Sequence, residues 1–231
     1  GTSGISFERE RRKETMKFIF IGDSLRQEND SSTYPQEGWP RERKGFYPEI
    51  DRVNLAKNGR STKSFLDEGR FQEALHLAKE GDLCFISFGH NDEKKEDPSR
   101  YTDPYGSYED NLIYRINERK KKGVSSILLT SITRLKYDED SVLLRTHKEY
   151  PKARKKVALL EKIPLIDLEE RTYQFLRKST FEENKKYYRI LEKNQYPNYP
   201  EGKDDHTHLT KTGATWIASR VADKLKKYNI G

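Results

Sequence analysis

The sequence predicts an α/β fold, a three-layer α/β/α sandwich around a five-stranded parallel sheet. Five short apolar runs alternate with segments that have helical periodicity. Runs of strand length that are apolar throughout are typical of parallel strands covered on both faces. Strands that alternate with helices of about 10 to 15 residues indicate βαβ units, whose right-handed crossovers place helices on both faces of the sheet.

The predicted strands are punctuated by glycine or polar residues. The first run, Lys17-Phe-Ile-Phe-Ile21, precedes Gly22, and the third, Asp82-Leu-Cys-Phe-Ile-Ser-Phe88, precedes Gly89. Such punctuation marks the turn that ends a strand. The five strands are expected over 17–21, 52–56, 82–88, 126–132 and 164–167.

Helical periodicity fills the intervals between these runs. Phe71, Leu75 and Ala78 fall on one face of a helix expected over 69–80. The segment 108–122 ends in a basic turn followed by Gly123, both of which are common at helix C-termini. Further helices are predicted over 151–161, where Leu159 and Leu160 join the apolar set, over 169–178, and over 211–227.

Composition excludes several classes of protein. Lys plus Arg number 45 against 38 Asp plus Glu, so the net charge is +7. This charge raises a nucleic-acid-binding module as a rival function, but acidic residues are interleaved with the basic ones and no base-reading motif is present. No apolar run approaches the ~18 residues of a membrane helix. The single cysteine excludes an internal disulfide framework.

The first fifteen residues are interpreted as an added leader or a fraying arm. Met16, the one methionine in the chain, stands directly before the first apolar run and is interpreted as a native start. We therefore expect one domain over 16–231 and no linker. No apolar segment follows the basic residues as in a signal peptide. A cytoplasmic protein is the default expectation, with a trimmed secreted parent as the alternative.

Polar residues gather where the predicted strands end. In parallel α/β sheets, ligands bind outside the carboxyl ends of the strands. Taken alone, each such segment is typical of a loop or a helix N-cap. The four segments are Gly22-Asp23-Ser24-Leu25, Asn58-Gly59-Arg60-Ser61, Gly89-His90-Asn91-Asp92 and, opening the last helix, Asp204-Asp205-His206-Thr207-His208-Leu209-Thr210.

In this order the four segments resemble the four blocks of the SGNH hydrolases, also called GDSL esterases and lipases. The resemblance implies Ser24 as nucleophile, Gly59 and Asn91 as oxyanion donors beside the Ser24 backbone N–H, and Asp205 with His208 as acid and base. It extends over essentially the whole chain from the first strand onward. It also implies the flavodoxin-like sandwich of that family.

The chemistry of these residue types supports the assignment. A serine hydroxyl needs a neighbouring base to become a good nucleophile. His208 can be that base if a carboxylate holds its other ring nitrogen, and Asp205 lies three residues earlier. Asp204 and His206 compete for these two roles, and spacing alone does not exclude them. A glycine lets a backbone N–H approach a substrate closely. Asn91 offers a neutral amide donor to a developing oxyanion.

Other stretches resemble the rhamnogalacturonan acetylesterase branch of the superfamily. They are Tyr34-Pro-Gln-Glu-Gly-Trp39, the block 54–61, and Phe88-Gly-His-Asn-Asp92. The resemblance implies removal of acetyl groups from pectic sugars, and an acylated carbohydrate as the partner. Leu25 and the stretch 179–203 depart from that branch. The candidate substrate-binding residues are Asp23, Trp39, His90 and His206.

Alternatives remain open at the level of sequence. The enzyme could act on another acyl ester, as a lysophospholipase or thioesterase does, although the loops after the strands hold few aliphatic side chains. The carboxylates and imidazoles of 204–208 could also suit a metal ion. No third distant ligand and no His-Glu-x-x-His helix is present, so we expect no metal. No phosphate loop or dinucleotide fingerprint occurs, and no cofactor is expected.

Overall fold

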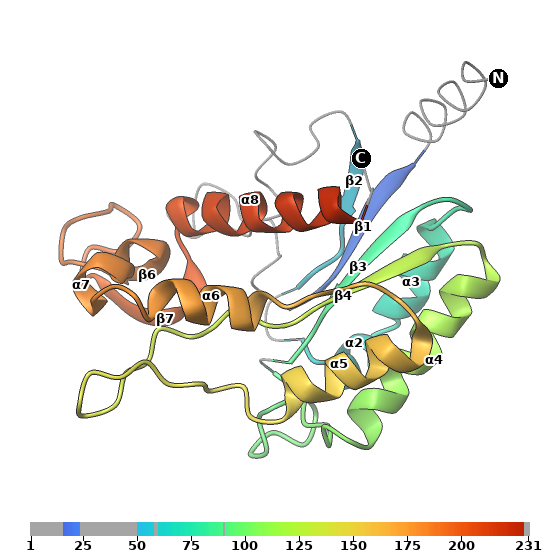
Figure 1. Ribbon diagram of the computed structural model, residues 1–231, viewed down its shortest axis with the longest axis horizontal. Helices are drawn as coiled ribbons and strands as arrows, with labels where there is room; N and C mark the ends of the chain where they lie inside the picture. Colours follow the sequence, from blue (N-terminus) through green and yellow to red (C-terminus); the bar gives the residue numbers. More distant parts are fainter. Residues whose placement is uncertain (1–15, 24–49, 58–59, 90, 229–231) are drawn as a thin grey trace.

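A parallel sheet organises the molecule (Figure 1). The structure, a computed structural model, describes residues 16–23, 50–57, 60–89 and 91–228. Five strands lie in the order β2-β1-β3-β4-β5, all parallel, as predicted. Their bounds are β1 Lys17–Gly22, β2 Asp51–Asn54, β3 Leu83–Ser87, β4 Ser125–Leu129 and β5 Leu165–Ile166. β1 extends one residue beyond its predicted run, to Gly22, whereas the other four strands are shorter than the runs predicted for them.

Helices cover both faces of this sheet. On one face lie α2 Thr62–Asp67, α3 Arg70–Leu77, α4 Ser107–Lys121 and α5 Tyr150–Glu161. On the other lie α6 Leu168–Leu176 and α8 Lys211–Lys227 (Figure 1). The bounds of α8 are those predicted, and α3, α4, α5 and α6 differ from prediction by one to three residues at their ends. The short helix α2 was not predicted, because six residues carry too little periodicity.

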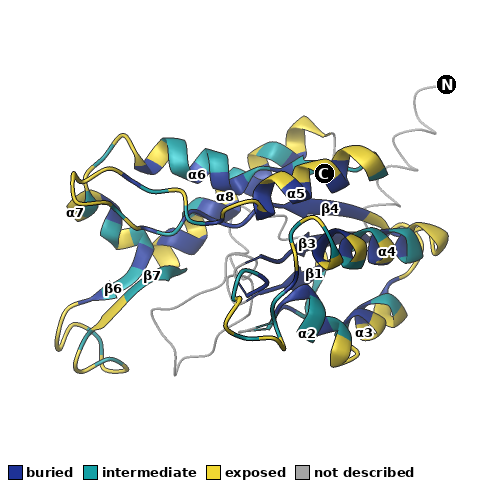
Figure 2. Cartoon of the chain, turned by 90° about the horizontal axis from the view of Figure 1, so that it is seen from below, coloured by how far each residue is buried: buried dark blue, intermediate teal, exposed yellow. Residues whose placement is uncertain are grey.

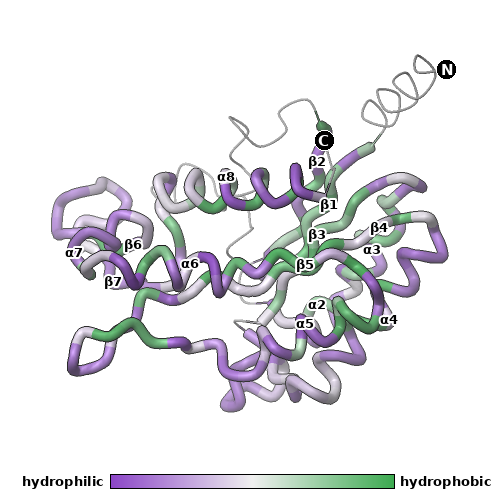
Figure 3. Tube along the Cα trace, viewed as in Figure 1, coloured by the Kyte–Doolittle hydropathy of each residue, from purple (hydrophilic) through white to green (hydrophobic). Residues whose placement is uncertain are grey.

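Alternating side chains divide the core into two layers. Phe18 and Phe20 of β1 face α8, whereas Ile19 and Ile21 face α3 and α4. Phe20 stacks on Phe85 of β3, with ring centroids 4.8 Å apart. The buried strands form the dark centre of Figure 2 and the hydrophobic centre of Figure 3. One apolar expectation is wrong: Leu159 and Leu160 of α5 are 80% and 60% exposed, because they lie on the outer side of the helix.

A second, two-stranded sheet lies beyond the main one. Strand β6, Tyr188–Leu191, pairs antiparallel with β7, Lys203–Leu209. The polar segment before the last helix was assigned no strand, but Lys203–Leu209 form β7, and Thr210 is the N-cap of α8. Helix α7, Phe181–Asn184, and a 3₁₀ turn, Lys185–Tyr187, lead into this ribbon. The ribbon extends away from the sheet in Figures 1 and 2.

Hydrogen bonds tie the ribbon to the carboxyl edge of the main sheet. The Leu135 N–H donates to the carbonyl of His206 at 3.0 Å. The Tyr188 hydroxyl donates to the carbonyl of Thr133. Each of these two bonds joins the ribbon to the loop that follows β4. They hold β7 at the carboxyl edge of the sheet, where the predicted site lies. Within the described part of the chain, no helix combines the length and apolarity needed to cross a membrane.

Candidate active site

The loops after β1 and β2 meet at the carboxyl edge. The Lys57 N–H donates to the carbonyl of Gly22 at 3.2 Å, and the Asp23 N–H donates to the carbonyl of Ser87 at 3.3 Å. Asp23 is completely buried. Complete burial of Asp23, which was a candidate for substrate binding, fits a side chain that organises this loop. Ser24, Trp39, Gly59 and His90 lie outside the described residues.

Asn91 connects the third strand-end loop to the second. Its side-chain amide lies between a hydrogen-bond acceptor and a hydrogen-bond donor. The Nδ2 amide donates to the carbonyl of Arg60 at 3.2 Å, and Oδ1 accepts from Nη1 of Arg100 at 3.1 Å. Since Arg60 directly follows Gly59, the two residues predicted to donate to an oxyanion belong to segments that are in contact.

The neighbouring Asp92 fixes the start of α2. Its carboxylate accepts from the hydroxyl and backbone N–H of Thr62, at 2.5 and 3.0 Å, and from the Thr102 hydroxyl at 2.6 Å. Burial raises the pKa of Asp92 to about 6, although these hydrogen bonds pull in the opposite direction. Asp92 thereby clamps the segment after Gly59 to the loop that carries Asn91.

Asp205 and His208 form the contact that their spacing predicts. His208 Nδ1 donates to Asp205 Oδ2 at 2.7 Å. The backbone N–H groups of Thr207 and His208 donate to Oδ1 at 2.9 and 3.0 Å. Burial would raise the pKa of Asp205, but the hydrogen bond and charge of His208, with these backbone donors, hold it well below its usual range. A neutral His208 ring that keeps its proton on Nδ1 carries its lone pair on Nε2.

An irregularity of β7 makes this contact possible. A regular strand would place residues three apart on opposite faces. Tyr188 of β6 pairs with Leu209 of β7, and Ile190 pairs with Asp204. Two residues of β6 therefore lie opposite five residues of β7. The extra residues of β7 bulge, and the bulge turns Asp205 and His208 toward each other.

Arg189 was missed by the sequence analysis. From β6 its Nη2 donates to Asp205 Oδ2 at 2.6 Å, and its Nη1 donates to the Tyr199 hydroxyl at 3.0 Å. Arg100 was missed as well. In a chain with 45 Lys and Arg residues, nothing in the local pattern distinguishes these two. Only the stretch around Arg189, which departs from the resembled branch, carried a signal of something particular to this chain.

His206 lies between Asp205 and His208 in β7 but bonds different partners. Its Nδ1 donates to the carbonyl of Leu135 at 2.6 Å, and its Nε2 lies 2.5 Å from Asp204 Oδ1. Both ring nitrogens are thus engaged within the ribbon and the adjoining loop. The Phe181 ring stacks on the imidazole, with centroids 5.9 Å apart and an angle of 18° between the planes.

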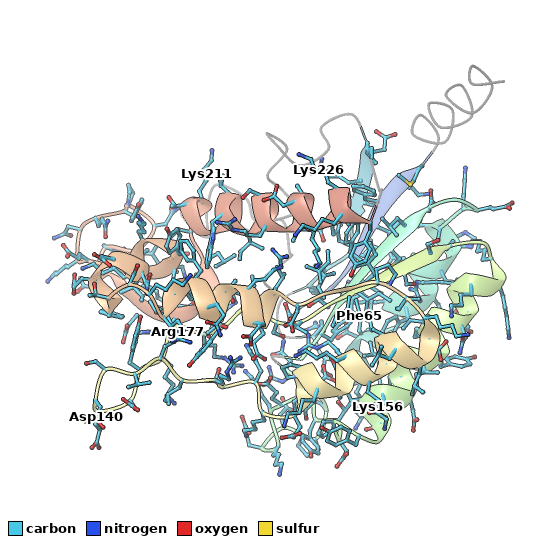
Figure 4. All side chains as sticks on the ribbon, in the orientation of Figure 1. Phe65, Asp140, Lys156, Arg177, Lys211 and Lys226 are labelled. Atoms are coloured by element: carbon cyan, nitrogen blue, oxygen red, sulfur yellow. The ribbon has the colours of Figure 1, made fainter. Side chains whose placement is uncertain are left out.

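His206 also lines a cavity of about 900 Å³. The other walls come from the loop after β4 and from the start of α7; Asp140 marks the outer tip of that loop in Figure 4. Arg134, one of the lining residues, binds Glu93 Oε2 at 3.1 Å, two residues beyond Asn91. The cavity therefore adjoins both the loop of Asn91 and the strand of Asp205 and His208. Among the described residues, no group of three His, Cys, Asp or Glu side chains could hold a metal ion.

Comparison with known proteins matches this chain to a family of esterases. Residues 20–216 match the model of the GDSL-like lipase/acylhydrolase family. Rhamnogalacturonan acetylesterase RhgT of Bacillus subtilis (strain 168) is 32% identical over 219 residues, which cover 94% of this chain and 93% of the relative. The probable rhamnogalacturonan acetylesterase YesY of the same organism is 36% identical over 210 residues, covering 90% and 92%.

Solved structures share the fold. Axe2, an acetylxylan esterase from Geobacillus stearothermophilus, superimposes with a TM-score of 0.64 at 18% identity, covering 94% of this chain and 96% of that one. Protein YXIM of Bacillus subtilis gives a TM-score of 0.74 at 20% identity; the match covers 94% of this chain but spans only 57% of that protein. The sheet, the family match and these relatives agree: the chain belongs to the GDSL-like lipase/acylhydrolase family and is a carboxylic ester hydrolase.

Proposed function

We propose that this enzyme removes acetyl groups from carbohydrate, specifically from a pectic, rhamnogalacturonan-type polysaccharide, by a serine esterase mechanism. The observation that carries the mechanism is the His208–Asp205 pair, held at 2.7 Å on a ribbon tied to the carboxyl edge of the sheet. The names of the two relatives at 32% and 36% identity support the substrate. The cavity of about 900 Å³ that His206 lines is large enough for more than one sugar ring.

Ser24 is the proposed nucleophile. His208 takes the hydroxyl proton through Nε2 as Ser24 attacks the acetyl carbonyl. The ring then carries a positive charge, which the ionised Asp205 stabilises through Nδ1. His208 returns the proton to the sugar oxygen as the acyl-enzyme forms, and water repeats the sequence to release acetate. Both ring nitrogens of His206 are engaged by Leu135 and Asp204, which supports His208 as the base.

The oxyanion is proposed to bind the backbone N–H groups of Ser24 and Gly59 and the amide of Asn91. Asn91 Oδ1 faces a guanidinium, which only donates, and Nδ2 faces a carbonyl, which only accepts. This arrangement sets the amide so that its second N–H can be offered to the substrate. Loss of one such donor typically lowers kcat by roughly 10² to 10³. We expect an effect of this size for Asn91→Ala.

The test of the nucleophile is Ser24→Ala, which should abolish hydrolysis of acetyl esters while the protein stays folded. Ser219→Ala, which removes a surface hydroxyl of α8, serves as the matched control and should keep wild-type rates. A serine-directed phosphonate should label Ser24 in the wild type, as read by peptide mass spectrometry. Residual wild-type rate in the purified Ser24→Ala protein would contradict the assignment.

The test of the substrate is a comparison of acetylated rhamnogalacturonan oligosaccharides, acetylated xylan oligosaccharides and p-nitrophenyl esters of rising chain length. We expect the highest kcat/KM on the first of these and faster turnover of acetyl than of octanoyl esters. Faster octanoyl turnover would instead indicate a lipase or lysophospholipase. Faster turnover of acetylated xylan would keep the esterase but change its carbohydrate.

A further inference from the structure

Arg100 stands in a position to control Asn91. Its Nη1 donates to Asn91 Oδ1 at 3.1 Å, and its Nε donates to Asp97 Oδ2 at 2.6 Å. Asn91 is nearly buried, whereas the Arg100 side chain is 26% exposed. The Arg100 guanidinium therefore reaches from the surface to Oδ1 of the amide whose N–H is proposed to bind the oxyanion.

The loop that carries Arg100 is fixed at its ends. The Thr102 N–H donates to the carbonyl of Asp92 at 3.2 Å, and the Thr102 hydroxyl donates to the Asp92 carboxylate. The Tyr150 hydroxyl bonds the carbonyls of both residues, at 2.8 and 2.5 Å. Because Asp92 directly follows Asn91, these bonds also fix the position of Arg100 relative to the amide.

Asp97 orients the guanidinium. Its Oδ1 accepts from the Ser99 hydroxyl at 2.5 Å and from the Ser99 N–H at 3.0 Å, so its other oxygen is directed at Arg100 Nε. The hydrogen bonds from Ser99 and Arg100 lower the pKa of Asp97, which keeps the carboxylate charged. The result is a chain of hydrogen bonds that runs from Asp97 through Arg100 to Asn91.

We propose that Arg100 is a positioning residue that locks the Asn91 amide in its donating orientation and strengthens it as an oxyanion donor. A guanidinium on Oδ1 draws electron density away from the amide nitrogen, so the N–H groups become more positive. It also opposes a flip of the amide, which would turn Oδ1 toward the oxyanion. This inference rests on the function proposed above for Asn91.

The experiment is a double-mutant cycle with Arg100→Ala and Asn91→Ala, read on p-nitrophenyl acetate. Arg100→Ala should lower kcat by about ten- to a hundredfold, the weight of one hydrogen bond to a charged group, with KM changed by less than about twofold. In the Asn91→Ala background, Arg100→Ala should cost less than about twofold, because the group it acts through is gone. A structural role would lower the rate equally in both backgrounds.

Arg70→Ala is the matched control. Its side chain is 25% exposed and its Nε binds a nearby carboxylate, Glu68, at 2.7 Å, as Arg100 binds Asp97. Among the described residues Arg70 bonds Glu68 and not Asn91, so the kcat of Arg70→Ala should stay at the wild-type value. Thermal unfolding of each variant separates lost stability from lost rate.

Added guanidinium offers a second readout. Arg100 lines a surface hollow of about 410 Å³, so a small cation can reach the place that the side chain leaves. Millimolar guanidinium should restore part of kcat in Arg100→Ala but not in the double variant. If Arg100→Ala keeps the wild-type kcat while Asn91→Ala is slow, the inference about Arg100 is overturned and the function proposed for Asn91 stands. Wild-type kcat in Asn91→Ala would contradict the function proposed for Asn91, and with it the inference.

Discussion

Asp205 receives as many hydrogen bonds as a carboxylate can accept. Four donors reach it: two backbone N–H groups on Oδ1, and His208 with Arg189 on Oδ2. A carboxylate has about four lone-pair sites, and all four are occupied here. Such a group stays ionised and cannot rotate, so it holds the His208 ring in one orientation. Both properties are what a residue needs in order to stabilise an imidazolium.

The same bonds predict how acid affects stability. The pKa of Asp205 is depressed in the folded state, whereas an unfolded Asp titrates near about 3.9. Its stabilisation is therefore fully present above that pH and is lost as the pH falls below it. The free energy of unfolding of the wild type minus that of Asp205→Asn should shrink by at most about 1.4 kcal/mol for each pH unit below about 3.9.

Urea unfolding of both proteins between pH 7 and pH 3 measures this difference. A difference that stays constant down to pH 3 would contradict the proposed depression of the pKa.

At the scale of elements, short segments bring the site together. Helix α2 has only six residues, yet its first residue, Thr62, donates to Asp92 from both backbone and side chain. Asp92 belongs to the loop after β3, so this contact joins two strand-end loops. The bulge of β7 has a comparable effect, since it brings Asp205 and His208 to one side. In both cases a local departure from a regular element creates the geometry.

The Asp92 clamp predicts a pH dependence of opposite sign. Its pKa is raised by burial to about 6 in the folded state, so between about pH 4 and pH 6 the folded chain binds a proton that the unfolded chain has released. Stability therefore falls as the pH rises through this window, in total by on the order of 3 kcal/mol. Asp92→Asn should flatten the slope of the free energy of unfolding against pH between 4 and 6. Equal slopes in the two proteins would show that Asp92 is ionised throughout.

Elements of the main sheet could be predicted from sequence, whereas the ribbon could not. The runs 17–21 and 82–88 are apolar because both sides of the sheet are covered, and such runs need no partner to be recognised. Strand β7, with the sequence Lys-Asp-Asp-His-Thr-His-Leu, is polar at six positions and lacks a regular alternation. Its extended form depends on pairing with β6 and on the bond from Leu135, which are contacts far apart in sequence.

The residues of the candidate site also fall into those that the sequence could predict and those that it could not. Asp205, His208 and Asn91 were assigned through the resemblance of their segments to a known family. The spacing of three between Asp205 and His208 also allowed a contact within one turn, and the contact exists, but on a bulged strand. Arg100 and Arg189 were not predictable, because a charged side chain has no pattern until the fold places it beside an amide or a carboxylate. Ser24 and Gly59 keep the roles that the resemblance assigns them as predictions.

At the scale of the whole molecule, the cavity next to the site is built from three distant stretches of chain. Tyr137 follows β4, Phe181 begins α7, and His206 lies on β7. Tyr137 meets Phe181 edge-on, with centroids 6.0 Å apart, and Phe181 stacks on His206. Ring faces of this kind pack against the C–H faces of sugars. We therefore expect this cavity to bind the sugars that flank the acetylated one.

Phe181→Ala tests that expectation. The variant should raise KM for an acetylated oligosaccharide by roughly three- to tenfold, the weight of one ring contact, and leave kcat on p-nitrophenyl acetate unchanged. Phe175→Ala is the matched control, since Phe175 packs on Trp216 outside the cavity, 4.9 Å between centroids, and should leave both parameters unchanged. A Phe181→Ala enzyme with wild-type KM on the oligosaccharide would place the flanking sugars elsewhere.

The separation of the ribbon from the main sheet has a consequence for biosynthesis. All five strands of the sheet lie between residues 17 and 166, but the proposed base and its carboxylate come at 208 and 205, followed by α8. During translation the chain emerges from its N-terminus, and domains tend to fold in that order. A nascent chain can therefore assemble the sheet and the Asn91 loop well before His208 leaves the ribosome. Hydrolysis must wait for the last part of the chain, so ribosome-stalled intermediates that end before the ribbon should be inactive toward esters.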